Sequence, residues 1–180
     1  MLVGFENGLL ATVDLATGDP VEVCRLCGGD IRSLVVNRRL GWVACGVSSK
    51  TEAGIIALSI QTNGRLTEGA LTKDATEVTP LAFIPTRAVR EIVGTKDGSR
   101  LYAGLRSGEL LAVDTSNWKI TRRCEARKGG TYAVALMGDV LLTGGSDHRL
   151  CTWDAESLTL RQEWDAHSRR IADVKFSPTG

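Results

Sequence analysis

The stretch LLTGGSDHRLCTWD, residues 141–154, decides how the rest of the chain is interpreted. A short apolar run at 141–144 is followed by turn-forming Gly, Ser and Asp within 145–149. A second run at 150–153 then ends at Asp154. Two such runs joined by turn residues are typical of a β-hairpin. We therefore expect two antiparallel strands and a tight turn here.

The same pattern occurs at residues 9–14 (LLATVD), 55–59 (IIALS) and 110–114 (LLAVD), each time before a turn and a further strand-like run. The last residues of the four runs, Asp14, Ser59, Asp114 and Asp154, are separated by 45, 55 and 40 residues. Self-similarity at a period of about 40 to 45 residues is typical of propeller blades. The sequence predicts an all-β protein: a β-propeller segment of about four blades, each a four-stranded antiparallel sheet.

The hairpin at 141–154 resembles a blade of the WD-repeat family. It ends in Trp153 and Asp154, and Asp147 precedes the Trp by six residues, as in those blades. In the family, a loop His, a second-strand Ser or Thr, the turn Asp and the Trp form a hydrogen-bonded set. The resemblance implies that Thr143, Asp147 and Trp153 form this set here. The loop His has no match, because its expected place is Arg-Lys-Gly-Gly at 127–130. His167 stands where the loop His of a further blade would be.

The blade-like units are predicted at about 1–25, 31–69, 90–123 and 132–164, with the first strand of a further blade at 171–177. The first unit begins at its second strand, and residues 65–69 are the expected outer strand of the second unit. Residues 70–89, which contain Pro80 and Pro85, break the pattern and are predicted to be an insertion. WD propellers usually have about seven blades. We therefore expect a fragment of a larger propeller whose remaining blades come from missing sequence. A closed four-bladed ring is the alternative.

Composition restricts the partners and the compartment. A net charge of +1 gives no general attraction to nucleic acid or membrane, so either would need a local patch. No apolar run approaches the ~20 residues that a membrane-spanning helix needs. The five cysteines are an odd number, and the first strand-like run is not preceded by a secretory signal. We therefore expect a cytoplasmic protein, with the nucleus as the alternative, and no membrane partner.

Residues suited to metal binding or catalysis are sparse in the sequence. Cys24 and Cys27 have the spacing of half a zinc knuckle, but the second half is absent, so we predict buried thiols and no metal. Neither His148 nor His167 belongs to a recognisable nucleophile motif, and no phosphate-binding glycine loop occurs. We predict no catalytic residue, no cofactor and no enzymatic activity.

The family resemblance implies a protein-interaction scaffold that binds other proteins through loops on one rim of the propeller. The loop at 48–54 (SSKTEAG) is expected on the same face. The basic residues Arg122, Arg123, Arg127 and Lys128 are interpreted as solvated strand and loop positions, and nucleic acid is not expected because no aromatic platform accompanies them. The rim candidates are Arg106, Ser107, Lys128, His148, Arg149, Arg169 and Arg170.

Two alternatives come from other resemblances. Residues 98–120 (GSRLYAGLRSGELLAVDTSNWKI) also resemble repeats of propeller enzymes of the lactonase or quinoprotein type. Such enzymes gather acidic groups, His or a metal around a central channel, and the sequence shows no such cluster on its inner strands. The other alternative is a cytoskeleton-binding propeller resembling the echinoderm microtubule-associated family, which differs only in its partner.

Overall fold

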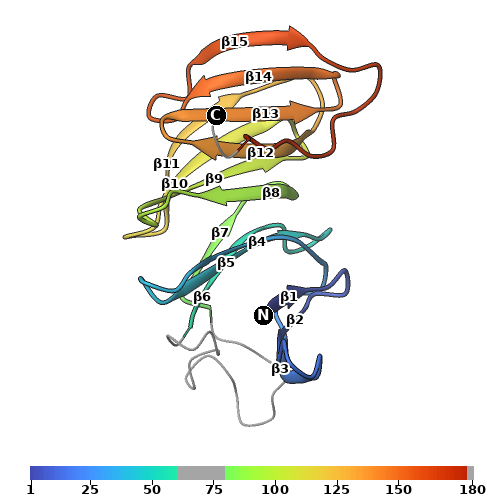
Figure 1. Cartoon of the computed structure of the whole chain (residues 1–180), viewed down its shortest axis with the longest axis vertical. Helices are drawn as coiled ribbons and strands as arrows, with labels where there is room; N and C mark the ends of the chain where they lie inside the picture. Colours follow the sequence, from blue (N-terminus) through green and yellow to red (C-terminus); the bar gives the residue numbers. More distant parts are fainter. Residues whose placement is uncertain (61–79, 178–180) are drawn as a thin grey trace. The chain divides into compact units, whose positions relative to one another are not determined.

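A computed structural model of the chain describes residues 1–60 and 80–177. All strands in these ranges pair antiparallel, and the ranges contain no helix. The strands form four sheets of three or four strands each, so the predicted all-β, propeller-like fold class is confirmed. The chain divides into two compact units, Met1–Ala88 (unit 1) and Val89–Gly180 (unit 2). Figure 1 shows the strands of each unit, coloured along the sequence.

Unit 1 holds two sheets. The first has three strands in the order β1-β2-β3. The second has four strands in the order β4-β5-β6-β7. The strands are β1 (Leu2–Gly4), β2 (Leu9–Val13), β3 (Pro20–Arg25), β4 (Asp30–Asn37), β5 (Trp42–Ser48), β6 (Gly54–Ser59) and β7 (Ala82–Pro85).

Unit 2 holds two four-stranded sheets in which each strand pairs with its neighbour in sequence. The hairpin that opened the sequence analysis is β13 and β14, with Leu141 opposite Trp153 and Thr143 opposite Cys151. The strands are β8 (Val89–Gly94), β9 (Arg100–Leu105), β10 (Glu109–Asp114), β11 (Lys119–Glu125), β12 (Thr131–Met137), β13 (Val140–Gly145), β14 (Arg149–Asp154) and β15 (Leu160–Asp165).

Two expected boundaries differ from the structure. The outer strand of the second sheet is β7, which pairs with β6 inside the stretch predicted as an insertion, with Ile55 opposite Ile84. Apolar Phe83 and Ile84 lie in this strand, and Pro85, one of the two prolines that suggested a loop, is its last residue. The predicted outer strand at 65–69 lies outside the described residues. Residues 171–177 form no strand, although Ile171 is buried and its N–H donates to the Gly145 carbonyl at 3.0 Å.

Middle strands such as β5 and β9 are buried along nearly their whole length, which agrees with their nearly continuous apolar sequences. In β5, every residue from Trp42 to Val47 is buried, whereas every residue of the outer strand β15 is exposed. The core of unit 2 lies between its two sheets, where Tyr102 and Leu110 of one sheet pack with Leu141 and Trp153 of the other. The two sheets of unit 2 therefore stack face to face, and the outer strand β15 is left in solvent.

Glycines on β1 and β13 let a later segment of the chain approach each sheet closely. A Cβ atom on Gly4 would lie 2.5 Å from Ile31 Cγ2, and one on Gly144 would lie 2.5 Å from Ile171 Cγ2. Both distances are too short for a real Cβ contact, so any side chain here would push the following segment away. Ile171 therefore occupies the place against its sheet that Ile31 occupies in unit 1.

Candidate functional site

One end of unit 2 carries four connecting segments that we call the rim: turn 106–108, loop 126–130, turn 146–148 and loop 166–170. Backbone hydrogen bonds join them in series. The Gly108 carbonyl accepts from Ala126 N at 3.0 Å, and the Gly130 carbonyl accepts from Ser146 N at 3.2 Å. The His148 carbonyl accepts from the N–H groups of residues 166 and 167 at 3.2 and 3.1 Å. The four segments therefore form one continuous surface.

The structure brings the seven predicted rim candidates together on or beside these segments, and all seven are exposed. Ser107 donates to Glu109 at 2.6 Å, and Arg149 is held by Asp165 at 3.0 Å and Glu163 at 3.1 Å. Within the described ranges, the other basic rim side chains have no ion pair; these are Arg106, Lys128, Arg169 and Arg170. Their charges are available to a partner. The other predicted segment, 48–54, lies in unit 1, where Glu52 accepts from Gly28 N at 3.2 Å.

The prediction that Arg127 is a solvated basic residue is wrong, because its side chain is fully buried. The guanidinium donates to Asp147 Oδ1, to Thr143 Oγ1 at 2.6 Å and to the Arg149 carbonyl at 3.1 Å. Trp153 Nε1 donates to the same Thr143 oxygen at 2.9 Å. The three residues predicted to share a hydrogen-bonded set are thus in contact through an arginine, which occupies the loop position where a histidine was expected.

This network explains why the loop before β12 and the β13–β14 hairpin hold a fixed geometry. An arginine with no exposed side-chain surface needs a carboxylate and further acceptors to offset its lost hydration. Asp147 and two oxygen acceptors fill that need. The remaining Nε atom is buried and has no hydrogen-bond partner in the described structure; a Cβ on Gly145 would lie 3.0 Å from it. Arg127, Asp147, Thr143 and Trp153 therefore support the rim from beneath.

His148 is exposed at the tip of the β13–β14 turn and has a left-handed backbone, with φ of 70°. Glycine occupies the corresponding place in two other hairpins: Gly8, with φ of 76°, and Gly108, with φ of 96°. Such a backbone is uncommon for residues with a Cβ, although His adopts it more readily than most, and Trp118 and Leu158 adopt it in other turns of unit 2. The conformation therefore reflects the hairpin turn, and His148 stays a contact candidate because of its exposure. His167 is also exposed, and its backbone N–H, described above, bonds to His148.

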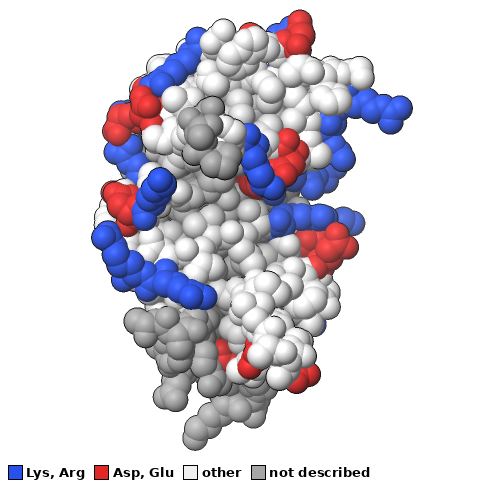
Figure 2. Space-filling model, viewed as in Figure 1, with Lys and Arg blue, Asp and Glu red and all other residues white. Residues whose placement is uncertain are grey.

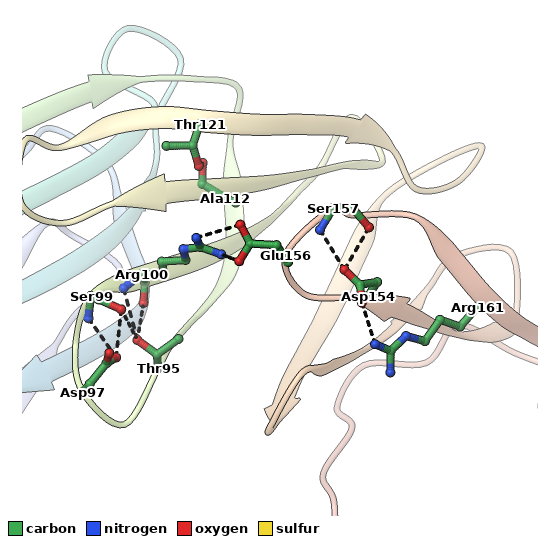
Figure 3. A network of polar contacts seen from close by, with 10 residues as sticks. All are labelled: Thr95, Asp97, Ser99, Arg100, Ala112, Thr121, Asp154, Glu156, Ser157 and Arg161. Atoms are coloured by element: carbon green, nitrogen blue, oxygen red, sulfur yellow. Dashed lines mark hydrogen bonds and ion pairs between the residues drawn. The ribbon is translucent and has the colours of Figure 1, made fainter.

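The opposite strand ends of unit 2 enclose a groove of about 620 Å³. Tyr102, Leu136 and Met137 supply apolar surface, and the Arg100–Glu156 ion pair lines one side. Figure 3 shows this pair joining β9 to the turn after β14, with Arg100 Nη2 at 2.9 Å from Glu156 Oε1. The sequence analysis had not identified this groove, because its residues come from three separate turns.

The carboxylates around the groove are held by local donors. Asp154 accepts from Ser157 N and Oγ, both at 2.8 Å, and from Arg161 at 2.6 Å (Figure 3). The Ser157 N–H and the Arg161 guanidinium hold the pKa of Asp154 well below its usual range. A hydrogen bond from the Thr95 hydroxyl has the largest effect on the pKa of Asp97. Together with hydrogen bonds from the N–H and the hydroxyl of Ser99, it lowers this pKa to about 2. Both groups are ionised at neutral pH and fix turns, which is a structural role.

The cysteines are free thiols, and four of the five are buried. Cys24, Cys27 and Cys45 share the core of unit 1. Burial raises the pKa of Cys24 to about 11 and holds the pKa of Cys45 even further above its usual range. Across residues 1–60 and 80–177, no three His, Cys, Asp or Glu side chains are placed to share a metal ion. In the same ranges, no helix has the length and apolar character needed to cross a membrane.

Comparison with known proteins supports the fold and offers one limited sequence match. No protein-family model matches the chain. Shk1 kinase-binding protein 15 of Schizosaccharomyces pombe is 36% identical over 58 residues, which are 32% of this chain and 17% of that protein. The crystal structure of the computationally designed Ika8 protein matches with a TM-score of 0.74 and 15% identity. That match covers 98% of this chain and 49% of the designed one, and at this identity it shows the fold alone.

Proposed function

We propose that this chain is part of a WD-repeat-like propeller in the cytoplasm that binds partner proteins through the rim of unit 2 and is not an enzyme. The observation that carries the proposal is the series of backbone hydrogen bonds that joins four rim segments into one surface. A surface whose backbone is already fixed avoids the entropy cost of ordering loops when a partner binds, so only its side chains lose conformational freedom. The partial match to a protein named for binding a kinase supports the same class of function.

The distribution of charge favours a protein partner over nucleic acid. Figure 2 shows Lys and Arg side chains interspersed with Asp and Glu side chains on the face in view, without one broad basic area. Nucleic-acid binding by phosphate contacts depends on a basic stripe or patch. The rim instead offers a few separate cations beside a histidine, a pattern suited to individual acidic side chains.

Site-specific photo-crosslinking tests the proposal. A photoreactive amino acid would replace Lys128 or His148 on the rim, or Leu160, which is also exposed, as a control on the outer strand β15. In cells that produce the protein, both rim positions should crosslink to the same partner proteins, and unlabelled wild-type protein should compete. Equal crosslinking from Leu160, or different proteins from the two rim positions, would contradict the proposal.

The lactonase or quinoprotein alternative has its own test. Metal analysis of the purified protein and a lactone-hydrolysis assay address it directly. Bound calcium together with turnover would overturn the assignment as a non-catalytic scaffold.

A further inference from the structure

We infer that Arg90, Tyr132 and Arg170 of unit 2 form a site that recognises an acidic group, a carboxylate or a phosphate, on a peptide segment of the partner. This inference rests on the proposed function and gives the partner a chemistry. The Arg90 guanidinium carbon lies 5.0 Å from the centroid of the Tyr132 ring, and that of Arg170 lies 4.9 Å from it. One phenol ring thus holds two cations.

The backbone presents these side chains in a specific way. Strand register is interrupted between Val89 and Glu91 in β8 and between Thr131 and Ala133 in β12, so Arg90 and Tyr132 are the extra residues. Such bulges redirect a side chain and are frequent beside functional sites. Strands β8 and β12 are neighbours, since Glu91 accepts from Val134 N at 3.1 Å. Arg170 reaches the ring from the rim loop 166–170.

The two cations have no counter-charge in the described part of the chain. Neither guanidinium makes an ion pair or hydrogen bond there, and Arg90 Nε is buried without a hydrogen-bond partner. The nearby acids are engaged elsewhere: Glu91 accepts from the backbone of β12, and Asp173 pairs with Lys175 at 2.8 Å. Two cations held beside one ring raise the local positive potential, and an oxyanion that contacts either guanidinium would lower it.

Unit 1 has an arginine at the position that matches Arg90, and the two can be compared. Its first complete sheet has the same register break between Ile31 and Ser33, so Arg32 is the extra residue there. Arg32 is paired with Asp30 and with Glu6, the latter at 3.3 Å. The matching position therefore holds an arginine paired with acids in unit 1 and, among the described residues, an arginine without an acidic partner in unit 2. We take this contrast as support for an acidic partner group at Arg90.

The chemistry of the site selects the ligand class. Guanidinium groups bind carboxylates and phosphates through paired N–H donors, and stacking on an aromatic ring limits their rotation before the ligand arrives. The rim around this site also carries Arg106, Lys128 and Arg169, and none of these three side chains forms an ion pair with a described residue. An acidic peptide crossing the rim would meet cations along its length and the two stacked arginines at one point.

Peptide binding to the full chain tests the inference. The probes are fluorescent peptides of equal length: an oligoglutamate, a neutral Gly-Ser peptide with one phosphoserine, and an oligoglutamine. Anisotropy at about 0.05 and 0.15 M salt gives each Kd. We expect the oligoglutamate, the phosphopeptide or both to bind, with oligoglutamine inactive. Arg90→Gln and Arg170→Gln should each weaken binding about fivefold, and the double variant tenfold or more.

Matched variants separate the site from general charge. Arg122→Gln removes the same charge from an exposed position on β11, and Tyr132→Phe keeps the ring; each should change Kd by less than about twofold. An equal loss in Arg122→Gln, or no binding of either acidic peptide, would overturn the inference. Equal affinity for an oligothymidine of the same length, lost in the same variants, would also overturn it by assigning the site to nucleic acid.

The failure of this inference and the failure of the proposed function have different signatures. Rim crosslinks that persist in the double arginine variant, with no acidic peptide bound by wild type, would refute only the inference. Peptide binding without partner crosslinks from Lys128 and His148 would refute only the proposed function. A thermal melt of each variant establishes that lost binding is not lost folding.

Discussion

Replacing Arg127 with Leu tests whether the buried arginine holds the rim loop to the β13–β14 hairpin. The substitution keeps apolar bulk but removes the donors to Asp147, Thr143 and the Arg149 carbonyl. It leaves the Asp147 carboxylate, whose side chain is only 21% exposed, without its cation. Breaking a buried ion pair by removing one partner costs about 3 to 5 kcal/mol. Because water still reaches Asp147, we expect a loss of about 3 kcal/mol.

Equilibrium unfolding in urea, followed by tryptophan fluorescence, measures this loss. With an m-value of about 2 kcal/mol/M, a loss of ~3 kcal/mol moves the midpoint down by about 1.5 M. The control is Arg123→Leu, which breaks an ion pair with Glu109 at 3.2 Å on the outer strand, where Arg123 is 55% exposed. Such surface pairs contribute at most about 1 kcal/mol. The control midpoint should therefore move by about 0.5 M or less.

A double variant separates the charge from the packing. We expect the loss of stability to come from the Asp147 carboxylate being left without its cation. In that case, adding Asp147→Leu to Arg127→Leu should restore about 1 to 2 kcal/mol of stability, because both charges are then removed together. Arg127→Leu and Arg123→Leu proteins with the same midpoint would refute the reasoning. A double variant that is less stable than the sum of its single changes would refute it as well.

Three further outcomes are expected. Gly108→Ala should lower stability by about 3 kcal/mol in thermal melts, because its Cβ would collide with backbone carbonyl oxygens. Its control is Gly138→Ala, which also has a positive φ but faces open space, and which should lower stability by about 1 kcal/mol. Iodoacetamide at pH 7.5 should label Cys24 and Cys45 only after unfolding, because burial raises both pKa values, and rapid native labelling would contradict this. Folding lowers the pKa of Asp154, so its contribution is present above the unfolded value and is lost as pH falls; stability measured from pH 5 to pH 2 should therefore fall less steeply in Asp154→Asn.

The sequence predicted the strands best where turn chemistry and apolar runs coincide. Residues 9–14, 55–59, 110–114 and 150–154 match β2, β6, β10 and β14 to within one residue at each end. β6 and β10 are buried along nearly their whole length and have uninterrupted apolar runs, whereas burial alternates along β14 and Thr152 interrupts its run. The fourth strand of the second sheet was misplaced because β7 is short, half-exposed and preceded by proline, so it lacks the apolar run that identified the others.

The site was predictable in its location and not in its contacts. Regular alternation of strands and turns is enough to place the seven candidate residues at one strand end. The depth of Arg127 is set instead by Gly145, which leaves room for the guanidinium behind the hairpin. The absence of a histidine at 127–130 was the one available signal, since the partners Thr143, Asp147 and Trp153 still needed a donor. The stacking of Arg90 and Arg170 on Tyr132 joins residues 80 positions apart, and no local pattern reports it.

The serial bonding of the rim has a consequence for how its surface can vary. Backbone atoms make the links from turn 106–108 to loop 166–170, so exchanging an exposed side chain leaves these links in place. Arg106, Lys128 and Arg169 form no ion pair with a described residue, and we expect their substitution to change stability by less than about 0.5 kcal/mol. If the proposed function is correct, the binding preference of gene duplicates can change residue by residue at these positions, while the supporting sheets stay under a separate and stricter constraint.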